Sequence, residues 1–314
     1  MPDQEREERW RNAGDADPPE SAVRRAVEIA LSEDLLPLGD LTASLLPAAA
    51  TGEALFVSRA HGVLAGTACA KEAGRQVGGV KVSFALGDGA PVEPGLVLGA
   101  MVGRFRSIVT AERTALNFLG HLSGVATLTS QYVRAVAAVN PDCRVWDTRK
   151  TTPGLRALEK AAVRAGGGVN HRGNLSEGVL VKDNHLGKTS ITASVRRALD
   201  LWPGRMVEVE CDLIEQVVEA VEAGATLVLC DNMSPEELRA CVAIVRDHPR
   251  GQAGAVLVEA SGRMNLDTIG DYAAAGPDLI SVGALTHSAP ALDIGLDLSL
   301  HEPHELSQAH EAHE

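Results

Sequence analysis

The chain has 314 residues, a net charge of −13 and 45 % hydrophobic residues, with few aromatics among them. This length accommodates one large α/β domain, or a barrel with a smaller partner domain. The excess of negative charge argues against non-specific binding to nucleic acid or to anionic membranes, because both attract proteins that carry an excess of cations.

The cysteines and the two ends of the chain exclude further classes of protein. Five cysteines are widely spaced without a C-x-x-C pair, which is typical of reduced cytoplasmic thiols and not of a disulfide framework or a zinc site. Residues 1–20 predict a mobile acidic arm, and residues 301–314 predict a solvated tail rich in His and Glu. No segment resembles a signal peptide or a membrane anchor, so we expect a cytoplasmic protein.

The pattern after residue 20 predicts a small α+β domain. Apolar residues at helical spacing predict a helix over 21–34, and Gly-punctuated apolar runs over 53–66 and 80–92 predict short strands. Residues 108–138 then predict a long helix, which Gly120 and Gly124 are expected to break or bend.

The rest of the chain repeats one unit, a short apolar run followed by a helical segment. The runs are rich in Val, Leu and Ile, as buried parallel strands are. Six or seven such units predict a (β/α) barrel, complete or incomplete, and a doubly wound sheet is the alternative. The predicted strands are 143–147, 178–182, 206–210, 226–230, 255–259 and 278–282.

Polar side chains recur at the carboxyl end of each predicted strand, where the loops of a barrel converge on one site. From Asp147 to Lys182 the chain carries a local charge of +4, although the whole protein is acidic. A cationic group of this kind can bind carboxylates or phosphates. Its expected members are Arg149, Lys150, His171, Arg172 and Lys182.

Two further parts of this site are predicted from the following strand ends. Glu210 and Asp231 can hold Mg²⁺ through water, or stabilise a positive charge that develops on carbon. Backbone amides at Ser261-Gly262 and Gly283-Ala284 are expected at turns that lead toward helices, where barrels bind phosphate. The three parts together indicate an anionic substrate, a metal ion and a cationic transition state.

Several residues have a structural interpretation beside the functional one. Arg156, Lys160 and Arg164 recur every four residues on one predicted helix face, which is as typical of a solvated or partner-facing surface as of a substrate site. His121 is interpreted as a core or capping histidine. Lys182 ends an apolar strand, where a lysine is either paired or functional, and we interpret it as functional.

Specific motifs occur in a fixed order over nearly the whole chain: DTRKTTPGLR at 147–156, GGGVNHR at 166–172, VKDNH at 181–185, VEVECD at 207–212 and EASG at 259–262. In these motifs the chain resembles the quinolinate phosphoribosyltransferase family. The resemblance implies an α/β protein with a type II phosphoribosyltransferase-like fold, namely an incomplete (β/α) barrel over 115–287 with an N-terminal α+β sandwich domain over 21–114. A return to that domain over 288–300 and a homodimer with shared active sites are also implied.

The resemblance implies a reaction as well. Quinolinate and phosphoribosyl pyrophosphate react with Mg²⁺ to give nicotinate mononucleotide, pyrophosphate and CO₂, and no organic cofactor is required. The implied ligands of the quinolinate carboxylates are Arg149, His171, Arg172 and Lys182, with Arg113 of the neighbouring subunit. Lys150 is implied to serve the pyrophosphate or the carboxylate that is lost. Glu210 and Asp231 are implied near the ribose and Mg²⁺, and Ser261, Gly262 and Gly283 at the 5′-phosphate.

The chain departs from the family pattern at two places. After Asn-His-Arg the family usually has one residue, Gly, Leu, a variable residue and Asp, where this chain has GNLSE at 173–177. Arg263 and Met264 follow Ser261-Gly262, where a small residue or Asn and then a β-branched residue are commoner. These departures favour one alternative, a phosphoribosyltransferase of the same architecture that acts on another pyridine or azine carboxylate.

Two alternatives belong to other classes. A Schiff-base lyase would use Lys182 as its nucleophile. A non-catalytic binding protein would lack some of the polar strand ends, whereas the main ones are all present.

Overall fold

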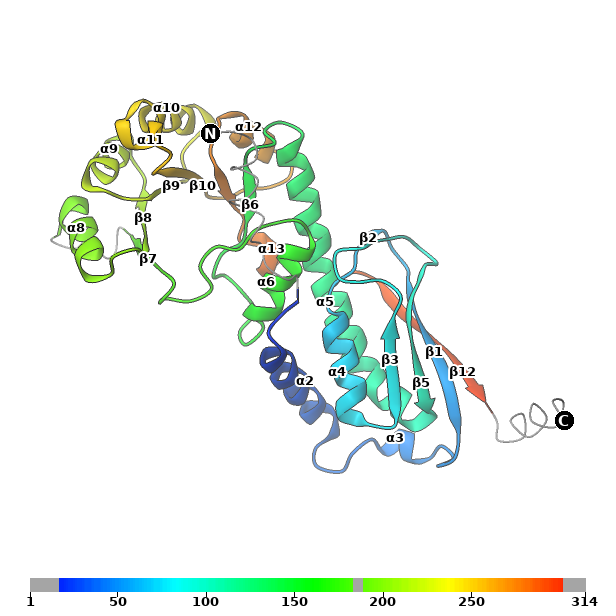
Figure 1. Cartoon of the computed structure of the whole chain (residues 1–314). Coiled ribbons are helices and arrows are strands. Elements are labelled where there is room, and N and C mark those ends of the chain that lie inside the picture. The colour runs from blue at the N-terminus through cyan, green and yellow to red at the C-terminus, as the bar shows by residue number, and fades with distance from the viewer. Residues whose placement is uncertain (1–16, 183–188, 302–314) are drawn as a thin grey trace. The chain divides into compact units, whose positions relative to one another are not determined.

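The computed structural model describes residues 17–182 and 189–301 (Figure 1). Most of the predicted N-terminal arm, nearly all of the predicted tail and the DNH part of the VKDNH motif lie outside these ranges. The chain divides into two compact units, which are described one at a time. The first comprises residues up to 128, 152–167 and those from 289 on, and the second comprises 129–151 and 168–288.

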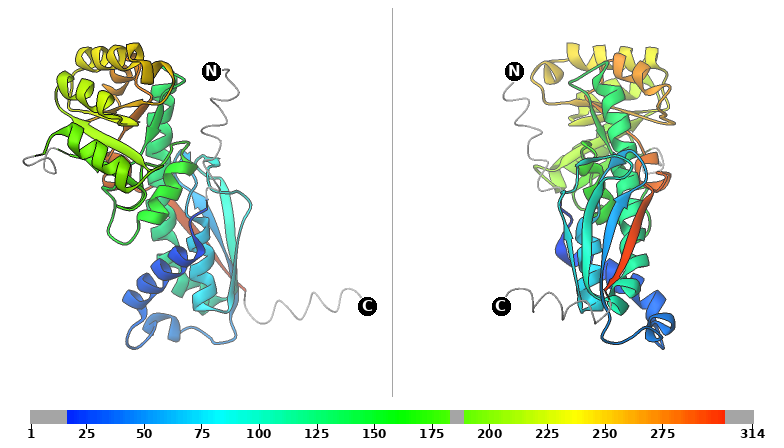
Figure 2. Two further views of the ribbon diagram at one scale, coloured as in Figure 1. Left: turned by 60° about the vertical axis from the view of Figure 1, so that its left-hand side comes forward. Right: turned by 90° about the vertical axis from the view of Figure 1, so that its right-hand side faces the viewer.

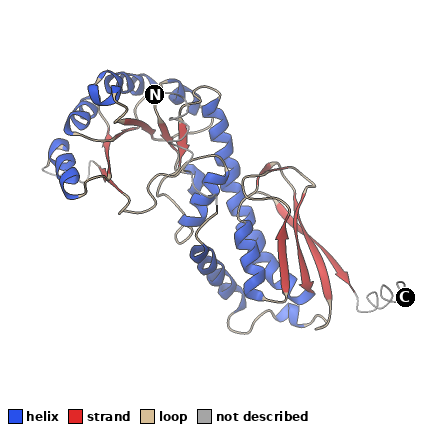
Figure 3. Ribbon diagram, viewed as in Figure 1, coloured by secondary structure: helices blue, strands red, loops and turns tan. Residues whose placement is uncertain are grey.

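The first unit is built on a four-stranded antiparallel sheet in the order β12-β1-β5-β3. The last strand returns to the start of the chain and pairs with β1 along its whole length, from Thr51 opposite His301 to Ser58 opposite Ile294. The helices of this unit lie on one side of the sheet (Figure 3). Its elements are α2 (Glu20–Leu35), α3 (Leu41–Ser44), β1 (Thr51–Ser58), β2 (Gly62–Val63), α4 (Thr67–Val77), β3 (Val80–Phe84), β4 (Pro91–Val92), β5 (Val97–Arg104), α6 (Arg156–Ala165) and β12 (Ile294–His301).

Helix α5 (Phe105–Ala137) is continuous, so of the break or bend predicted near Gly120 and Gly124 the break is wrong. Both glycines serve a close approach of another segment of the first unit. A Cβ atom on Gly124 would lie 2.1 Å from the carbonyl oxygen of Pro290, and one on Gly120 would lie 3.2 Å from that of Leu292. The glycines therefore mark a packing contact in which backbone lies directly on the helix.

The second unit contains a six-stranded parallel sheet in the order β6-β11-β10-β9-β8-β7. Five strands follow one another in chain order, and the first strand, β6, pairs with the last, β11. This circular order is that of a barrel, and among the described residues β6 and β7 do not pair. The predicted incomplete barrel is thereby confirmed. Its strands are β6 (Arg144–Trp146), β7 (Gly178–Val181), β8 (Met206–Cys211), β9 (Leu227–Asp231), β10 (Leu257–Ser261) and β11 (Leu279–Ser281).

The helices that come between the strands of this unit in the chain follow the outer side of the curved sheet (Figures 1 and 2). A doubly wound sheet would carry helices on both faces, so that alternative is wrong. The helices are α8 (Ile191–Leu201), α9 (Ile214–Ala223), α10 (Pro235–Asp247), α11 (Pro249–Gln252), α12 (Ile269–Ala274) and α13 (Ala284–His287). In the described part of the chain, no helix is both long enough and apolar enough to cross a membrane.

Candidate active site

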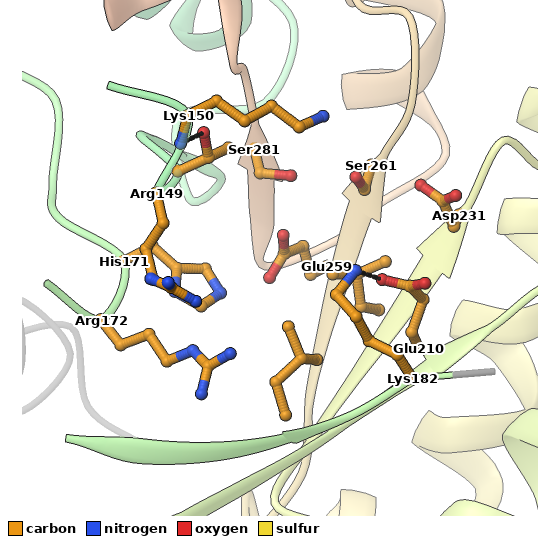
Figure 4. Close-up of a pocket in the computed structure, with 13 residues that line it drawn as sticks. Arg149, Lys150, His171, Arg172, Lys182, Glu210, Asp231, Glu259, Ser261 and Ser281 are labelled. Atoms are coloured by element: carbon orange, nitrogen blue, oxygen red, sulfur yellow. Dashed lines mark hydrogen bonds and ion pairs between the residues drawn. The ribbon is translucent and has the colours of Figure 1, made fainter. Parts of the chain in front are cut away.

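A pocket of about 330 Å³ lies at the carboxyl ends of the parallel strands in the second unit (Figure 4). The alternation of side chains along each strand explains its composition, because residues two apart face the same side of a sheet. Glu210, Leu229 and Glu259 occupy one row across β8, β9 and β10, and Asp231 and Ser261 occupy the next. The pocket is lined by Thr148, Arg149, Lys150, His171, Arg172, Leu180, Lys182, Glu210, Leu229, Asp231, Glu259, Ser261 and Ser281.

The structure brings most of the predicted site residues into this pocket and divides them into two sides. Arg149, His171 and Arg172 lie on one side, while Glu210 and Asp231 lie on the other (Figure 4). Lys150 and Ser261 also line the pocket, whereas Gly262 and Gly283 are absent from its lining. Arg113 is an exposed residue of α5 in the first unit and is not among the described residues that line the pocket.

Lys182 lies on the acidic side of the pocket, because its ammonium group forms an ion pair with the carboxylate of Glu210. The two side chains are 39 % and 14 % exposed, so the pair is only partly screened by water. The ammonium group of Lys182 therefore lies against a carboxylate at the wall of the pocket.

His171 is buried on the cationic side and is held at three points. Its backbone N–H donates to Asp147, 2.9 Å away, and its ring lies 4.4 Å from the ring of Trp146. Its Nε2 atom lies 3.1 Å from a carboxylate oxygen of Glu208, which is fully buried. These contacts come from two strands and from the loop after β6, so they fix the imidazole before a substrate arrives.

Arg172 places a partly buried guanidinium group in the same wall. Its Nη1 atom donates to the carbonyl oxygen of Gly178, 2.7 Å away. Burial lowers the pKa of Arg172, Glu208 raises it, and the positive charge of Arg149 lowers it. The group stays charged at neutral pH, since arginine does not lose its proton in proteins.

Glu259 is a fully buried carboxyl group at the base of the pocket. Burial raises its pKa well above the ordinary value, and the negative charge of Glu208 raises it further. The nearby Ser281 and Trp146 side chains lower this pKa and so act in the opposite direction. The carboxyl group is therefore neutral over much of the pH range in which other glutamates are charged.

The acidic side suits a hard cation. Glu210 and Asp231 supply carboxylate oxygens, and Asn232 donates to one oxygen of Asp231 at 2.7 Å. Mg²⁺ is usually held by one or two carboxylates together with water and substrate phosphates. The donor set fits this ion, which would neutralise phosphate charge when bound.

The two turns that were predicted to bind phosphate differ in their geometry. Gly262 has φ +141°, and a Cβ atom there would lie 3.0 Å from the side chain of Asn232, so the turn after β10 requires glycine. Gly283 directly precedes the four-residue helix α13, with its Cα beside the Lys150 side chain. The turn after Gly262 does not enter a helix directly, because α12 begins only at Ile269. Arg263 is exposed and does not line the pocket.

The candidates with a structural interpretation lie in the first unit. His121 Nε2 lies 2.8 Å from a carboxylate oxygen of Glu159, and that buried carboxylate also accepts from the backbone N–H of Thr152. Lys160 is 7 % exposed, so a solvated face along α6 is wrong for its central residue. His121 thus has a side-chain partner in Glu159, although its own side chain is 33 % exposed.

Three polar lining residues were given no role from the sequence: Thr148 and Glu259 were noted only as polar residues at strand ends, and Ser281 was missed. For the two that lie in strands, the alternation of side chains between the two faces of a strand could have indicated their position. Glu259 precedes Ser261 by two positions, and Ser281 follows buried Leu279 by two. Counting back from each strand end would have placed them on the inner face.

The sequence of this chain matches two family models. Residues 40–123 match the quinolinate phosphoribosyl transferase N-terminal domain, and residues 125–297 match the C-terminal domain. The chain belongs to the quinolinate phosphoribosyl transferase family.

Relatives in this family match over nearly their whole length. The chain is 41 % identical to a nicotinate-nucleotide pyrophosphorylase (carboxylating) of Mycobacterium leprae over 88 % of this chain and 97 % of that protein. It is 39 % identical to a probable nicotinate-nucleotide pyrophosphorylase (carboxylating) of Archaeoglobus fulgidus over 83 % of this chain and 98 % of that one. The structure of the nicotinate-nucleotide pyrophosphorylase from Francisella tularensis superposes with a TM-score of 0.83 at 36 % identity, covering 90 % of this chain and 98 % of that chain.

Proposed function

We propose that this protein transfers the phosphoribosyl group of phosphoribosyl pyrophosphate to quinolinate and releases CO₂, which yields nicotinate mononucleotide and pyrophosphate. The observation that carries the proposal is the division of one pocket into a cationic wall and an acidic wall. The cationic wall matches the two carboxylates of quinolinate, and the acidic wall matches a ribose that becomes positively charged during transfer. Relatives that carry this activity in their names support the same conclusion.

The cationic wall binds and orients the dianion. Arg149 and Arg172 offer forked donors that suit carboxylates, and His171 adds a third contact. Neutralising the carboxylates lets the ring nitrogen approach C1 of the ribose. A bond forms from that nitrogen to C1 while the bond from C1 to the pyrophosphate oxygen breaks.

Loss of CO₂ follows from the charge of the new pyridinium ring. The bond between C2 and its carboxylate breaks, the electron pair stays on C2 beside the positive nitrogen, and a proton then adds at C2. We assign Lys150 to the pyrophosphate or to the carboxylate that leaves, and Lys182 to a carboxylate of quinolinate. Glu210 and Asp231 would stabilise positive charge on C1 and hold Mg²⁺, with Ser261, Gly262 and Gly283 at the 5′-phosphate.

The assembly that we propose is a homodimer in which Arg113 serves the pocket of the neighbouring subunit. Its exposure on α5 leaves it accessible to a neighbouring subunit, which supports this assignment. We place the protein in the cytoplasm, which fits the five free, buried cysteines.

The test is quinolinate-dependent release of pyrophosphate and CO₂ from phosphoribosyl pyrophosphate with Mg²⁺. Nicotinate and other pyridine or azine carboxylates are compared in parallel. Turnover with quinolinate in preference to the others is expected. Faster turnover with another carboxylate would instead identify a phosphoribosyltransferase of different specificity, which is the alternative that the departures at 173–177 favour.

A further inference from the structure

The segment 173–177 is closed by the side chain of Glu177. One carboxylate oxygen of Glu177 accepts from the backbone N–H of Gly173, and the other accepts from the side-chain amide of Asn174, both at 2.6 Å. The amide oxygen of Asn174 accepts in turn from the backbone N–H of Ser176 at 2.8 Å. These hydrogen bonds tie the end of the segment to its beginning.

Arg172 is attached at both ends of this closed segment. Its main chain leads directly into Gly173, and its guanidinium group donates to the carbonyl oxygen of Gly178, directly after Glu177. Gly178 is itself fixed, because it is buried and pairs with Met206 at the start of β7. The carboxylate of Glu177 therefore sets the distance between the backbone of Arg172 and the carbonyl group that orients its side chain.

We propose that Glu177, together with Asn174, is a positioning residue that orients the guanidinium group of Arg172 in the pocket. The proposal rests on the function proposed above. Both residues are exposed and neither lines the pocket, so they act through Arg172 and not on the substrate. The geometry of residues 173–177 thus controls how tightly the wall that contains Arg172 binds a dicarboxylate.

The expected effect is on binding and not on bond making. A guanidinium group gives two parallel hydrogen bonds to a carboxylate only in one plane, so a loosened Arg172 binds quinolinate less well. Bond formation at C1 and the loss of CO₂ depend on side chains other than Arg172. A change at Glu177 should therefore raise KM for quinolinate and leave kcat and KM for phosphoribosyl pyrophosphate nearly unchanged.

The experiment measures these constants in Glu177→Ala, Asn174→Ala and Ser176→Ala. Loss of the whole carboxylate should raise KM for quinolinate about tenfold, and loss of the Asn174 amide should raise it about threefold. Ser176→Ala is the matched control, because its backbone N–H still donates to Asn174. Its KM should equal that of the unaltered protein.

The double variant Glu177→Ala with Arg172→Ala separates positioning from a general loss of structure. If Glu177 acts through Arg172, removing Glu177 changes nothing further in the Arg172→Ala protein. An added rise in KM in that background, or an unchanged KM in Glu177→Ala alone, would refute the role of Glu177. Absence of quinolinate turnover in the unaltered protein would refute the proposed function instead.

Discussion

At the scale of single residues, Glu259 is the group whose protonation differs most clearly from that of a free glutamate. Its pKa in the folded protein is raised well above the ordinary value of 4.5, chiefly by burial and then by the charge of Glu208. The folded state therefore holds this proton more tightly than the unfolded chain does. The protonated Glu259 contributes fully to stability below the ordinary pKa of 4.5, and this contribution is lost as the pH rises through the raised pKa of the folded state.

Glu259→Gln should remove this pH dependence, because an amide of the same shape does not ionise. We expect the stability of the variant relative to the unaltered protein to increase with pH, by at most about 1.4 kcal/mol per unit from about pH 5 upward. The measurement is the free energy of unfolding, or the Tm, over this range. Glu222→Gln at an exposed site of α9 is the control. Parallel curves for all three proteins would contradict the neutral state of Glu259.

The identity of the pocket residues was more predictable from the sequence than their pairing. Arg149, His171 and Arg172 were expected together as cations of one positively charged stretch, and they do share one wall. Lys182 was grouped with them by charge, yet it pairs with Glu210 on the other side. Proximity along a charged stretch cannot show this, since the partner comes from the next strand and its distance depends on sheet register.

At the scale of elements, hydrophobic runs located the six parallel strands to within about three residues, which is the usual uncertainty of such boundaries. The helix break at Gly120 and Gly124 failed for a physical reason. Glycine lowers helix propensity by only about 1 kcal/mol, which the burial of α5 outweighs. The contact that requires these glycines comes from residues 290–292, more than 160 positions later in the chain.

Gly124→Ala tests this explanation, because the explanation predicts whether the variant is more or less stable than the unaltered protein. In an ordinary helix, replacing Gly by Ala stabilises the protein by about 0.5–1 kcal/mol. Here the added methyl group would lie 2.1 Å from the Pro290 carbonyl oxygen, so backbone must move and a loss of about 1–3 kcal/mol is expected.

The readout is Tm, and Gly270→Ala in α12 is the matched control, because its added Cβ atom meets only Val139 at 3.8 Å. The control should be neutral or stabilising. A Tm at or above that of the unaltered protein in Gly124→Ala would show that the close approach is absent.

At the scale of the whole molecule, the repeat of strand and helix was enough to predict a barrel, and motif order was enough to assign the family. The gap between β6 and β7 could not be read from the repeat, because pairing depends on geometry and not on the apolar pattern of either strand. The oligomeric state of the protein cannot be seen in the structure of one chain. Arg113 is the residue through which the proposed dimer can be tested, since it is exposed in the first unit while the pocket lies in the second.

Mixed dimers of Arg113→Ala and Lys182→Ala should regain activity that neither variant has alone. In a mixed dimer, the pocket with an intact Lys182 receives an intact Arg113 from its partner, whereas the other pocket carries both defects. Random mixing makes half of the dimers mixed, each with one working pocket, so about a quarter of normal activity is expected.

The matched control mixes Lys182→Ala with Arg149→Ala, whose changes lie in the same pocket. Each pocket of that mixed dimer keeps one defect, so no activity should return. Recovery only with Arg113→Ala requires that this arginine crosses to the neighbouring subunit. If neither mixture recovers although differently tagged subunits are shown to have exchanged, each pocket is complete within one chain, and Arg113 then acts on its own subunit.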